Sequence, residues 1–496
     1  MTVVLACDLG STSLRVALVD ENGRVLHAVS LASASASVGE SDEIDPRLWR
    51  DVFASAVGRL AEAAGVAFDA VEAIAISSLT RTQVFLGPDH EPLRPAITWR
   101  DTRAQAVIEH VRGLFAAAHP EAAQLTTFHP LARLAWLAQE EPQTARRLRA
   151  VVEPKDYLNL WLTGECTIDP VGSARLLAAR DGLKGLGYDE SVVSHVVEPG
   201  VAVGHVRRGL PGALGRLAGR PVIAMGSDTW ASVIGLGALR DGYAYNLSGT
   251  TEVLGVLSRK QAAADGLLTV DWRNGLSQLG GPSQNGADTL VWLMSLLGQG
   301  GKEPGTALEA LLAGPRDAQP LLFLPYLRGE RTPHWDPALR GAFVGLNRRH
   351  GPADCARAAL EGIAFLNRLV LERAEAATGR KVGEIRFGGG GAANAAWCQI
   401  KADICGRTVA VADSAEPGLL GAAIVALTAL DRFKDLVEGQ AALVRVRQRH
   451  EPRAETTEFY DRLYGLYREA ESALAPISRK LVSLQHDMTA TPRLPA

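Results

Sequence analysis

Two turns in this chain carry residue types that can bind a phosphate group. The first is the sequence Asp-Leu-Gly-Ser-Thr-Ser at residues 8–13, which joins two apolar, β-branched segments within residues 3–20. Gly10 would let the backbone approach a ligand closely, the three hydroxyls after it can donate hydrogen bonds, and Asp8 can hold a hydrated Mg²⁺. The same residue types are common in ordinary turns, so this stretch alone predicts a β-hairpin and leaves phosphate binding open.

A second turn repeats the first almost half a chain length later. Residues 243–257 contain an apolar segment, then the sequence Asn-Leu-Ser-Gly-Thr-Thr, and then another apolar segment. A polar residue, a leucine, small residues that include a glycine, and hydroxyl side chains recur in the same order. An internal repeat of such a hairpin predicts two similar domains that face one cleft, with the phosphates of a nucleotide held between the two tips.

The length and the charge of the chain narrow the class of protein. With 496 residues the chain can form two domains that each have a substantial core. Its net charge of -3 at pH 7 and its scattered basic residues argue against a nucleic-acid or membrane-surface partner. No apolar run reaches the roughly 18 residues that a membrane-spanning helix needs.

The cysteines and the first residues indicate the compartment. The five cysteines are far apart and lack CxxC spacing, a pattern that predicts neither a disulfide framework nor a zinc site. Such cysteines are typical of a protein in a reducing compartment. The first residues lead directly into a predicted strand without a basic leader or a cleavage site. We therefore expect a soluble, cytoplasmic protein.

Polar side chains that could contact a substrate cluster at three other places. Residues 80–83 follow the buried strand predicted at 71–78, residues 97–103 hold a Trp, an Asp and two Arg, and Asp228 follows the strand predicted at 221–225. Open α/β folds bind their ligands at the carboxyl ends of parallel strands, so these groups are candidate substrate contacts. Solvated loops with local ion pairs and, for Asp228, a helix N-cap are the alternatives.

Four consecutive glycines, residues 388–391, lie between a predicted strand and a helix predicted from Ala395. They remove every side chain from one surface, so a flat ring could lie against the bare backbone. The spacing is not that of GxGxxG in an opening βαβ unit, and the chain has no GxxxxGK[ST] motif. We interpret this turn as a nucleotide contact, with a flexible turn as the alternative.

Together these features resemble the FGGY family of carbohydrate kinases, within the actin, hexokinase and Hsp70 ATPase superfamily. The resemblance runs from about Val3 to about Leu427. Its most specific segments are, in chain order, DLGSTSLR, PKDYLNLWLTGE, PYLRGERTPHWDPALRG, GLNRRHGPADCARAALEGIAF and FGGGGAANAAW. The resemblance implies an α/β protein with two ribonuclease-H-like (actin-like ATPase) domains flanking a central cleft that binds ATP and Mg²⁺. We place these domains at residues 1–241 and 242–480 and expect residues 486–496 to form a disordered tail.

The resemblance also implies roles for residues that match the family's motifs. Asp228 is the expected general base, which accepts the proton of a sugar hydroxyl as the γ-phosphoryl group transfers in line. Asp8 is the expected metal ligand. The expected ATP contacts are Gly10, Ser11, Thr12, Ser13, Arg15, Gly249, Thr250, Gly389, Gly390 and Asn394. The expected sugar contacts are Arg81, Thr82, Trp99, Asp101, Asp228 and Thr229.

The sugar itself is implied less directly than the reaction. Xylulose kinases of the family have a Gly-Gln-Met-His-Gly type of loop where this chain has residues 78–82, so the Met-His pair is missing. Glycerol kinases have an Arg-Glu pair there and a Gln after the base, and this chain keeps Arg81 but replaces the other two with Thr82 and Thr229. We expect a pentulose such as xylulose, with another ketose or a polyol as alternatives, because two segments are most similar to the xylulose kinase branch: PAITWRDTRA and PYLRGERTP.

Two other classes fit the sequence less well. An ATPase module that couples nucleotide state to a protein partner would lack the sugar-side loops at Arg81 and Trp99. A catalytically silent sugar-binding regulator would have lost Asp8 or Asp228, and both are present. A homodimer is expected only as a general tendency of such kinases.

Overall fold

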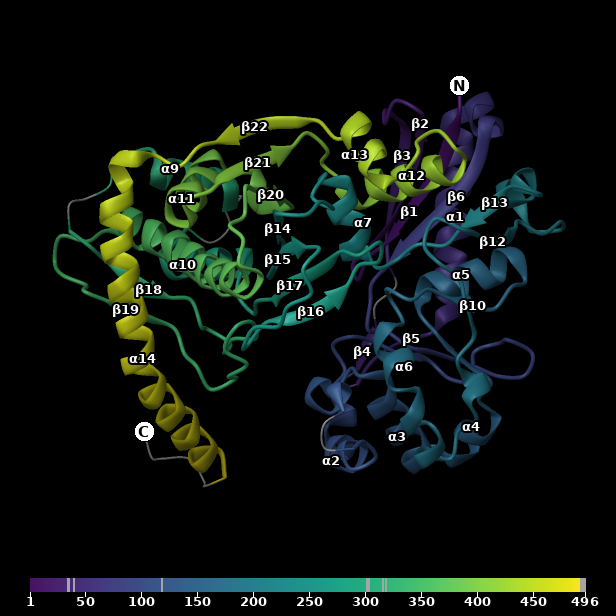
Figure 1. Cartoon of the computed structure of the whole chain (residues 1–496), viewed down its shortest axis with the longest axis horizontal. Coiled ribbons are helices and arrows are strands. Elements are labelled where there is room, and N and C mark those ends of the chain that lie inside the picture. Colours follow the sequence, from purple (N-terminus) through teal and green to yellow (C-terminus); the bar gives the residue numbers. More distant parts are fainter. Residues whose placement is uncertain are drawn as a thin grey trace. The chain divides into compact units, whose positions relative to one another are not determined.

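Two compact units make up the protein in this computed structural model, which describes residues 1–33, 36–38, 41–116, 119–299, 304–314, 316 and 319–490. The N-terminal unit consists of Met1–Gly235 and Glu416–Val444, and the C-terminal unit of Leu236–Ala415 and Arg445–Ala496 (Figure 1). The predicted boundary at residue 241 lies close to the first of these divisions. The structure differs from the prediction at Glu416–Val444, which we expected in the second domain, because its helices pack on the first unit.

The N-terminal unit is built on a six-stranded sheet in the order β12-β13-β6-β1-β2-β3. These strands span, in that order, Ala202–His205, Pro221–Ile223, Val71–Ser78, Val3–Leu9, Ser13–Asp20 and Val25–Ala32. β1 pairs antiparallel with β2, as the hairpin predicted, and parallel with β6 on its other side. The carboxyl end of β6 therefore lies beside the hairpin tip.

Two helices from distant parts of the chain cover this sheet. The odd-numbered residues of β1 pack in one core with Trp49 and Phe53 of α1 (Pro46–Ala64). α12 (Pro417–Ala429) contacts β1, β2 and β6 and crosses α7 (Asp228–Gly235). A Cβ at Gly421 would overlap the backbone of α7, so glycine permits this close crossing.

The C-terminal unit repeats the same strand arrangement in a seven-stranded sheet of order β16-β17-β15-β14-β20-β21-β22. These strands span Leu268–Asp271, Ser277–Pro282, Glu252–Ser258, Tyr243–Ser248, Glu384–Gly388, Thr408–Ala412 and Val446–His450. β14 pairs antiparallel with β15 and parallel with β20, as β1 does with β2 and β6. Helices α10 (Pro352–Thr378) and α11 (Ala395–Cys405) share its core. The repeat seen in the sequence is therefore a repeat of the fold, and the predicted α/β class is confirmed.

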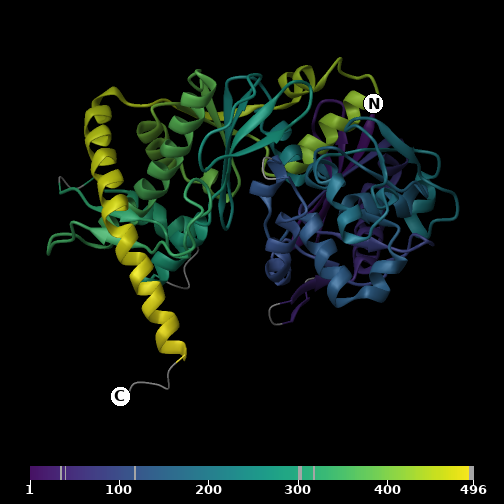
Figure 2. The ribbon, with the colours of Figure 1, turned by 60° about the horizontal axis from the view of Figure 1, so that its bottom comes forward.

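The last helix, α14 (Ala454–Ala490), corrects one prediction. Its first half packs in the second core of this unit through Tyr460, Tyr464 and Tyr467, and its last turns extend away from the rest of the unit (Figure 2). The predicted tail of residues 486–496 begins inside this helix, so residues 486–490 are helical rather than disordered. Residues 491–496 lie outside the described residues.

The remaining elements are short and surround the two sheets. The other helices are α2 (Ile108–Arg112), α3 (Pro130–Glu140), α4 (Pro142–Arg147), α5 (Pro154–Thr163), α6 (Ala174–Ala178), α8 (Ala287–Leu296), α9 (Pro304–Leu312) and α13 (Leu436–Leu443). The other strands are β4 (Ala36–Val38), β5 (Ser41–Ile44), β7 (Val84–Leu86), β8 (Ala96–Ile97), β9 (Ala150–Val152), β10 (Thr167–Ile168), β11 (His195–Val196), β18 (Leu322–Leu324) and β19 (Ala342–Val344). Among the described residues, no helix combines the length and the apolarity needed to cross a membrane.

Candidate active site

The first hairpin presents a carboxylate at its base. Asp8 lies opposite Arg15 across the β1–β2 pair, and the tip closes with a hydrogen bond from the Gly10 N–H to the Ser13 carbonyl (2.9 Å). The Asp8 side chain is partly exposed, and its Oδ1 accepts a hydrogen bond from the hydroxyl of Ser77 at the end of β6 (3.2 Å). The hairpin therefore holds a carboxylate next to a turn that carries three hydroxyl side chains.

The charge of Asp8 is only partly balanced. Burial raises the pKa of Asp8 to about 6, the Ser77 hydrogen bond and the Arg15 charge lower it, and Glu416 raises it. Arg15 forms an ion pair with Glu416 (3.1 Å). Gly418, at the start of α12, also approaches Asp8, because a Cβ there would lie 2.9 Å from Asp8 Oδ2. Neither Glu416 nor Gly418 could be found from local sequence patterns, since they lie far from the hairpin in the chain.

Asp228 is the first residue of α7, after β13. The helix is capped by the residue before it, since Ser227 Oγ accepts the Trp230 N–H at 3.1 Å. Asp228 Oδ1 accepts the N–H of Thr229 at 2.6 Å and its hydroxyl at 3.3 Å. The N-cap alternative for Asp228 is therefore excluded, and its second carboxylate oxygen is not engaged by Thr229.

Asp228 lies in the electrostatic field of two other predicted site residues. Burial raises the pKa of Asp228 to about 6, and the negative charge of Asp8 adds to this increase. The hydrogen bonds from Thr229 and the positive charge of Arg81 act in the opposite direction. The structure therefore brings together the predicted base, the predicted metal ligand and two predicted sugar contacts.

The predicted sugar-side residues differ in exposure. Arg81 follows β6, and its guanidinium lies 4.9 Å from the centre of the Phe128 ring. Trp99 is 36% exposed, and its Nε1–H donates to Ser11 Oγ on the hairpin tip (2.9 Å). The indole therefore connects the sugar-side loop to the predicted phosphate turn.

Two predicted sugar contacts are buried and bonded within the unit. The Thr82 hydroxyl donates to the Thr80 carbonyl (3.4 Å). Asp101 Oδ2 accepts hydrogen bonds from Arg103 Nη2 (2.7 Å) and from the Asp42 N–H (3.0 Å). Arg103 hydrogen bonds hold the pKa of Asp101 below its usual value despite burial, which acts in the opposite direction. Both residues therefore shape the loops rather than presenting their side chains at a surface.

The second hairpin exposes its tip in the same way as the first. Gly249 and Thr250 are exposed, and the Gly249 N–H donates to the Thr251 carbonyl (3.0 Å). The first residues of α8 support the tip from behind: the N–H of Ala287 donates to the Gly249 carbonyl (3.1 Å) and that of Asp288 to the Thr250 carbonyl (3.2 Å). Hydrogen bonds from α8 thus engage the carbonyl groups of both tip residues.

The glycine turn is only partly a bare surface. Gly389 and Gly390 are exposed, whereas Gly388 and Gly391 are buried. Gly389 has a φ of 85°, and a Cβ there would collide with the Ser248 carbonyl, whereas Gly390 faces open space. The surface without side chains is therefore smaller than the four glycines suggested, because tight packing accounts for most of them.

Asn394 caps α11 through its side chain. Its Oδ1 accepts the Trp397 N–H at 2.8 Å. Its Nδ2 is buried and has no hydrogen-bond partner. A buried donor without a partner is uncommon, so this amide retains a hydrogen bond that a ligand could accept.

Comparison with known proteins identifies the family. The chain belongs to the FGGY family of carbohydrate kinases, whose N-terminal domain matches residues 3–235 and whose C-terminal domain matches residues 244–430. The protein is thus an enzyme, an ATP-dependent phosphotransferase that acts on a carbohydrate, as the sequence predicted.

Individual relatives match over nearly their full length. A xylulose kinase from Escherichia coli K12 is 29% identical over 95% of this chain and 99% of its own length. A gluconokinase from Bacillus subtilis is 26% identical over 94% of both chains. The crystal structure of a xylulose kinase from Rhodospirillum rubrum superposes with a TM-score of 0.84 at 25% identity, over 96% of this chain and 99% of that one.

Proposed function

We propose that this kinase phosphorylates a pentulose such as xylulose and that Asp228 is its general base. Xylulose kinases among the similar sequences and structures support the pentulose. The observation that carries the base is the geometry of Asp228, which does not cap its helix and has one oxygen fixed by Thr229. The other oxygen is the proposed proton acceptor.

The raised pKa of Asp228 suits this role. A carboxylate whose pKa is about 6 is ionised at neutral pH and is a stronger base than an ordinary aspartate. Asp228 would align the sugar hydroxyl and accept its proton as the oxygen attacks the γ-phosphorus and the bond to the departing ADP breaks. Asp228 would then hold the proton, so the oxygen that has bonded to phosphorus carries no positive charge in the product.

The residues around Asp8 fit a hydrated Mg²⁺ ion. The negative charge of Asp8 raises the pKa of Asp228, and the Ser77 hydroxyl adds a further oxygen beside Asp8. Hard cations such as Mg²⁺ prefer such oxygen donors and keep several waters. We therefore assign Asp8 as the metal ligand, and the ion would neutralise charge on the phosphate oxygens.

ATP contacts are proposed in each unit separately. In the N-terminal unit, the donors would be the turn residues Gly10, Ser11, Thr12 and Ser13 together with Arg15. In the C-terminal unit, Gly249 and Thr250 would bind phosphate, and Gly389, Gly390 and Asn394 would contact the adenosine. The exposed tips and the unpaired Asn394 amide support these assignments.

The sugar contacts are proposed on one side of Asp228. Arg81, Trp99 and Thr229 would contact the sugar directly, because each has an exposed or partly exposed side chain. Thr82 and Asp101 would support them from inside the loops, since their side chains are buried. Arg81, which matches the glycerol kinases, keeps a polyol such as glycerol or erythritol as the second candidate.

A direct assay tests this proposal. We would measure ADP release with Mg-ATP across pentuloses, hexuloses, polyols and sugar acids such as gluconate, with a no-sugar blank. One sugar, xylulose by our proposal, is expected to raise the rate far above the blank, and Asp228→Asn is expected to abolish the increase. Equal rates with every sugar and the blank would contradict the proposal, and a preference for gluconate or glycerol would replace the pentulose. Light scattering on the same sample would test the expected homodimer.

A further inference from the structure

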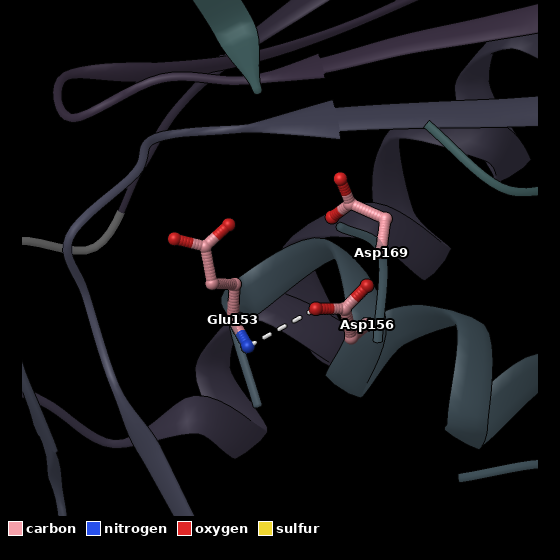
Figure 3. A group of neighbouring side chains, drawn as sticks. All are labelled: Glu153, Asp156 and Asp169. Carbon is pink, nitrogen blue, oxygen red and sulfur yellow. Dashed lines mark hydrogen bonds between the residues drawn. The ribbon is translucent and has the colours of Figure 1, made fainter. Parts of the chain in front are cut away.

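A buried lysine lies among three carboxylates in the N-terminal unit. The Lys155 Nζ lies 3.2, 3.1 and 2.6 Å from carboxylate oxygens of Glu153, Asp156 and Asp169, respectively. The three carboxylates converge at the start of α5, where the Glu153 N–H donates to Asp156 (Figure 3). Their oxygens are close enough to hold a metal ion, but the ammonium group of Lys155 bonds to all three. Lys155 therefore takes the place of a metal cation in this cluster and offsets part of its negative charge.

Glu153 connects this cluster to the proposed sugar loop. While Oε2 accepts from Lys155, Oε1 accepts the backbone N–H of Arg81 at 3.1 Å. Arg81 has a φ of 57°, in the left-handed region that residues other than glycine rarely adopt. Glu153, which is held in place by Lys155, thus binds the backbone N–H of Arg81, a residue in a strained conformation.

Arg133 of α3 holds the carbonyl side of the same residue. Its Nη1 donates to the Arg81 carbonyl at 2.7 Å and to the Ile97 carbonyl at 2.8 Å. It also hydrogen bonds to the Gln83 side chain and to the carbonyl of Thr98, which precedes Trp99. Arg133 is fully buried, so it cannot contact a sugar itself. Arg133 therefore joins the loop at Arg81 to the segment that carries Trp99.

We propose that Glu153 and Arg133 are positioning residues of the sugar subsite, which hold Arg81 in its left-handed conformation and so direct its guanidinium toward the sugar and Asp228. This inference rests on the proposed function of Arg81 as a sugar contact. The guanidinium already lies over the Phe128 ring, and its charge lowers the pKa of Asp228. The hydrogen bonds to the Arg81 N–H and to the Arg81 carbonyl hold the peptide units on both sides of its Cα, and in this way they keep an arginine in this backbone conformation.

The test uses the full-length protein and conservative variants. Glu153→Gln keeps the size of the side chain but cannot supply two carboxylate oxygens to its two donors. We expect it to raise the KM for the sugar roughly tenfold and to leave the KM for ATP within about twofold. Arg133→Lys, which keeps the charge but loses the forked geometry, is expected to have a similar but smaller effect. It also tests the proposal if Glu153→Gln does not fold.

A double substitution distinguishes positioning from general structural support. If Glu153 acts through Arg81, then Glu153→Gln adds less than about twofold to the sugar KM of an Arg81→Ala protein. The matched control is Asp20→Asn, since Asp20 is a buried carboxylate that accepts the N–H groups of Asn22 and Arg24 (both 2.9 Å) at the far end of the β1–β2 hairpin. We expect this control to leave both KM values unchanged.

Three results would overturn the inference. The sugar KM could stay within twofold in both single variants, the ATP KM could rise equally, or Glu153→Gln could have the same effect with and without Arg81. In each case a wild-type protein that still phosphorylates its sugar preserves the proposed function. A wild-type protein that phosphorylates no sugar overturns both.

Discussion

The two hairpins share one fold but differ in charge at the equivalent position of their first strands. In the first, Asp8 is partly exposed, lies beside Ser77 of the parallel strand, and is only partly balanced by Arg15. In the second, the equivalent position is Asn246, which is buried and donates hydrogen bonds to Glu252 and to the Val253 carbonyl (both 3.3 Å). The ionisable group at this position is present in only one of the two repeats.

The C-terminal repeat does contain a carboxylate, but it is fully compensated. Glu252 is buried and lies 3.0 Å from Lys401 Nζ, and Asn367 donates to it at 3.0 Å. Lys401 also lies over the rings of Phe387 and Trp397. The carboxylate of the C-terminal copy is thus used for structure, whereas the carboxylate of the N-terminal copy is the one for which we propose a chemical role.

Replacing Asp8 with asparagine, the residue that the second hairpin has at the equivalent position, is expected to have the largest effect on activity. Asp8→Asn removes the proposed metal ligand, so we expect kcat to fall roughly 10⁴-fold, or about 5.5 kcal/mol in activation free energy. Because burial makes the ionised Asp8 unfavourable, the free energy of unfolding at pH 7 should stay the same or rise. Steady-state kinetics and urea unfolding measure the two quantities, and a variant with more than a tenth of wild-type kcat would contradict the assignment.

Removing the compensation in the second repeat should reduce stability rather than chemistry. Lys401→Met leaves Glu252 buried without its cation, which is expected to cost about 3 kcal/mol in urea unfolding. The control is the double variant Lys401→Met/Glu252→Gln, which removes the uncompensated charge and should recover part of the loss. An unfolding midpoint equal to that of the wild type would show that this ion pair does not support the hairpin.

The neighbouring glycines of the C-terminal repeat form a matched pair. Gly389→Ala places a side chain against the Ser248 carbonyl at a φ of 85°, so we expect a loss of about 2 kcal/mol in stability. Gly390→Ala points into open space and should change stability by less than about 0.5 kcal/mol. A rise in the KM for ATP in the stable Gly390 variant would support the adenosine contact, and an unchanged KM would count against it.

The smallest expected effect is a pH dependence that comes from the N-terminal repeat. Asp228 has its pKa raised to about 6, so it is ionised above this value and protonated below it. A protonated base cannot accept a proton, and kcat/KM for the sugar should therefore fall about tenfold between pH 7 and pH 5. The folded protein holds this proton more tightly than the unfolded chain, so the contribution of Asp228 to stability decreases as pH rises from about 4 to 6. A flat kcat/KM profile from pH 5 to 7 would argue against Asp228 as the base.

The sequence predicted what local patterns and repetition encode. The two hairpins could be found because residues 8–13 and 246–251 repeat in order, and Asp228 because it follows a strand. The contacts of Glu416 and Gly418 with the first hairpin could not be predicted, since they depend on α12 packing on a sheet from the other end of the chain. Nor could the burial of Arg133, because an arginine on a helix is usually exposed and only the surrounding carbonyl groups make burial favourable.

The return of Glu416–Val444 to the N-terminal unit affects how the protein can be made and divided. A ribosome must translate residue 444 before the first unit has all of its helices, so this unit cannot finish folding until the Leu236–Ala415 part of the second unit has been synthesised. A gene fragment that stops at residue 235 would leave the α12 side of β1 and α7 uncovered, and its product should aggregate. Each unit of this kinase is therefore compact, but neither is encoded by one continuous segment of the chain.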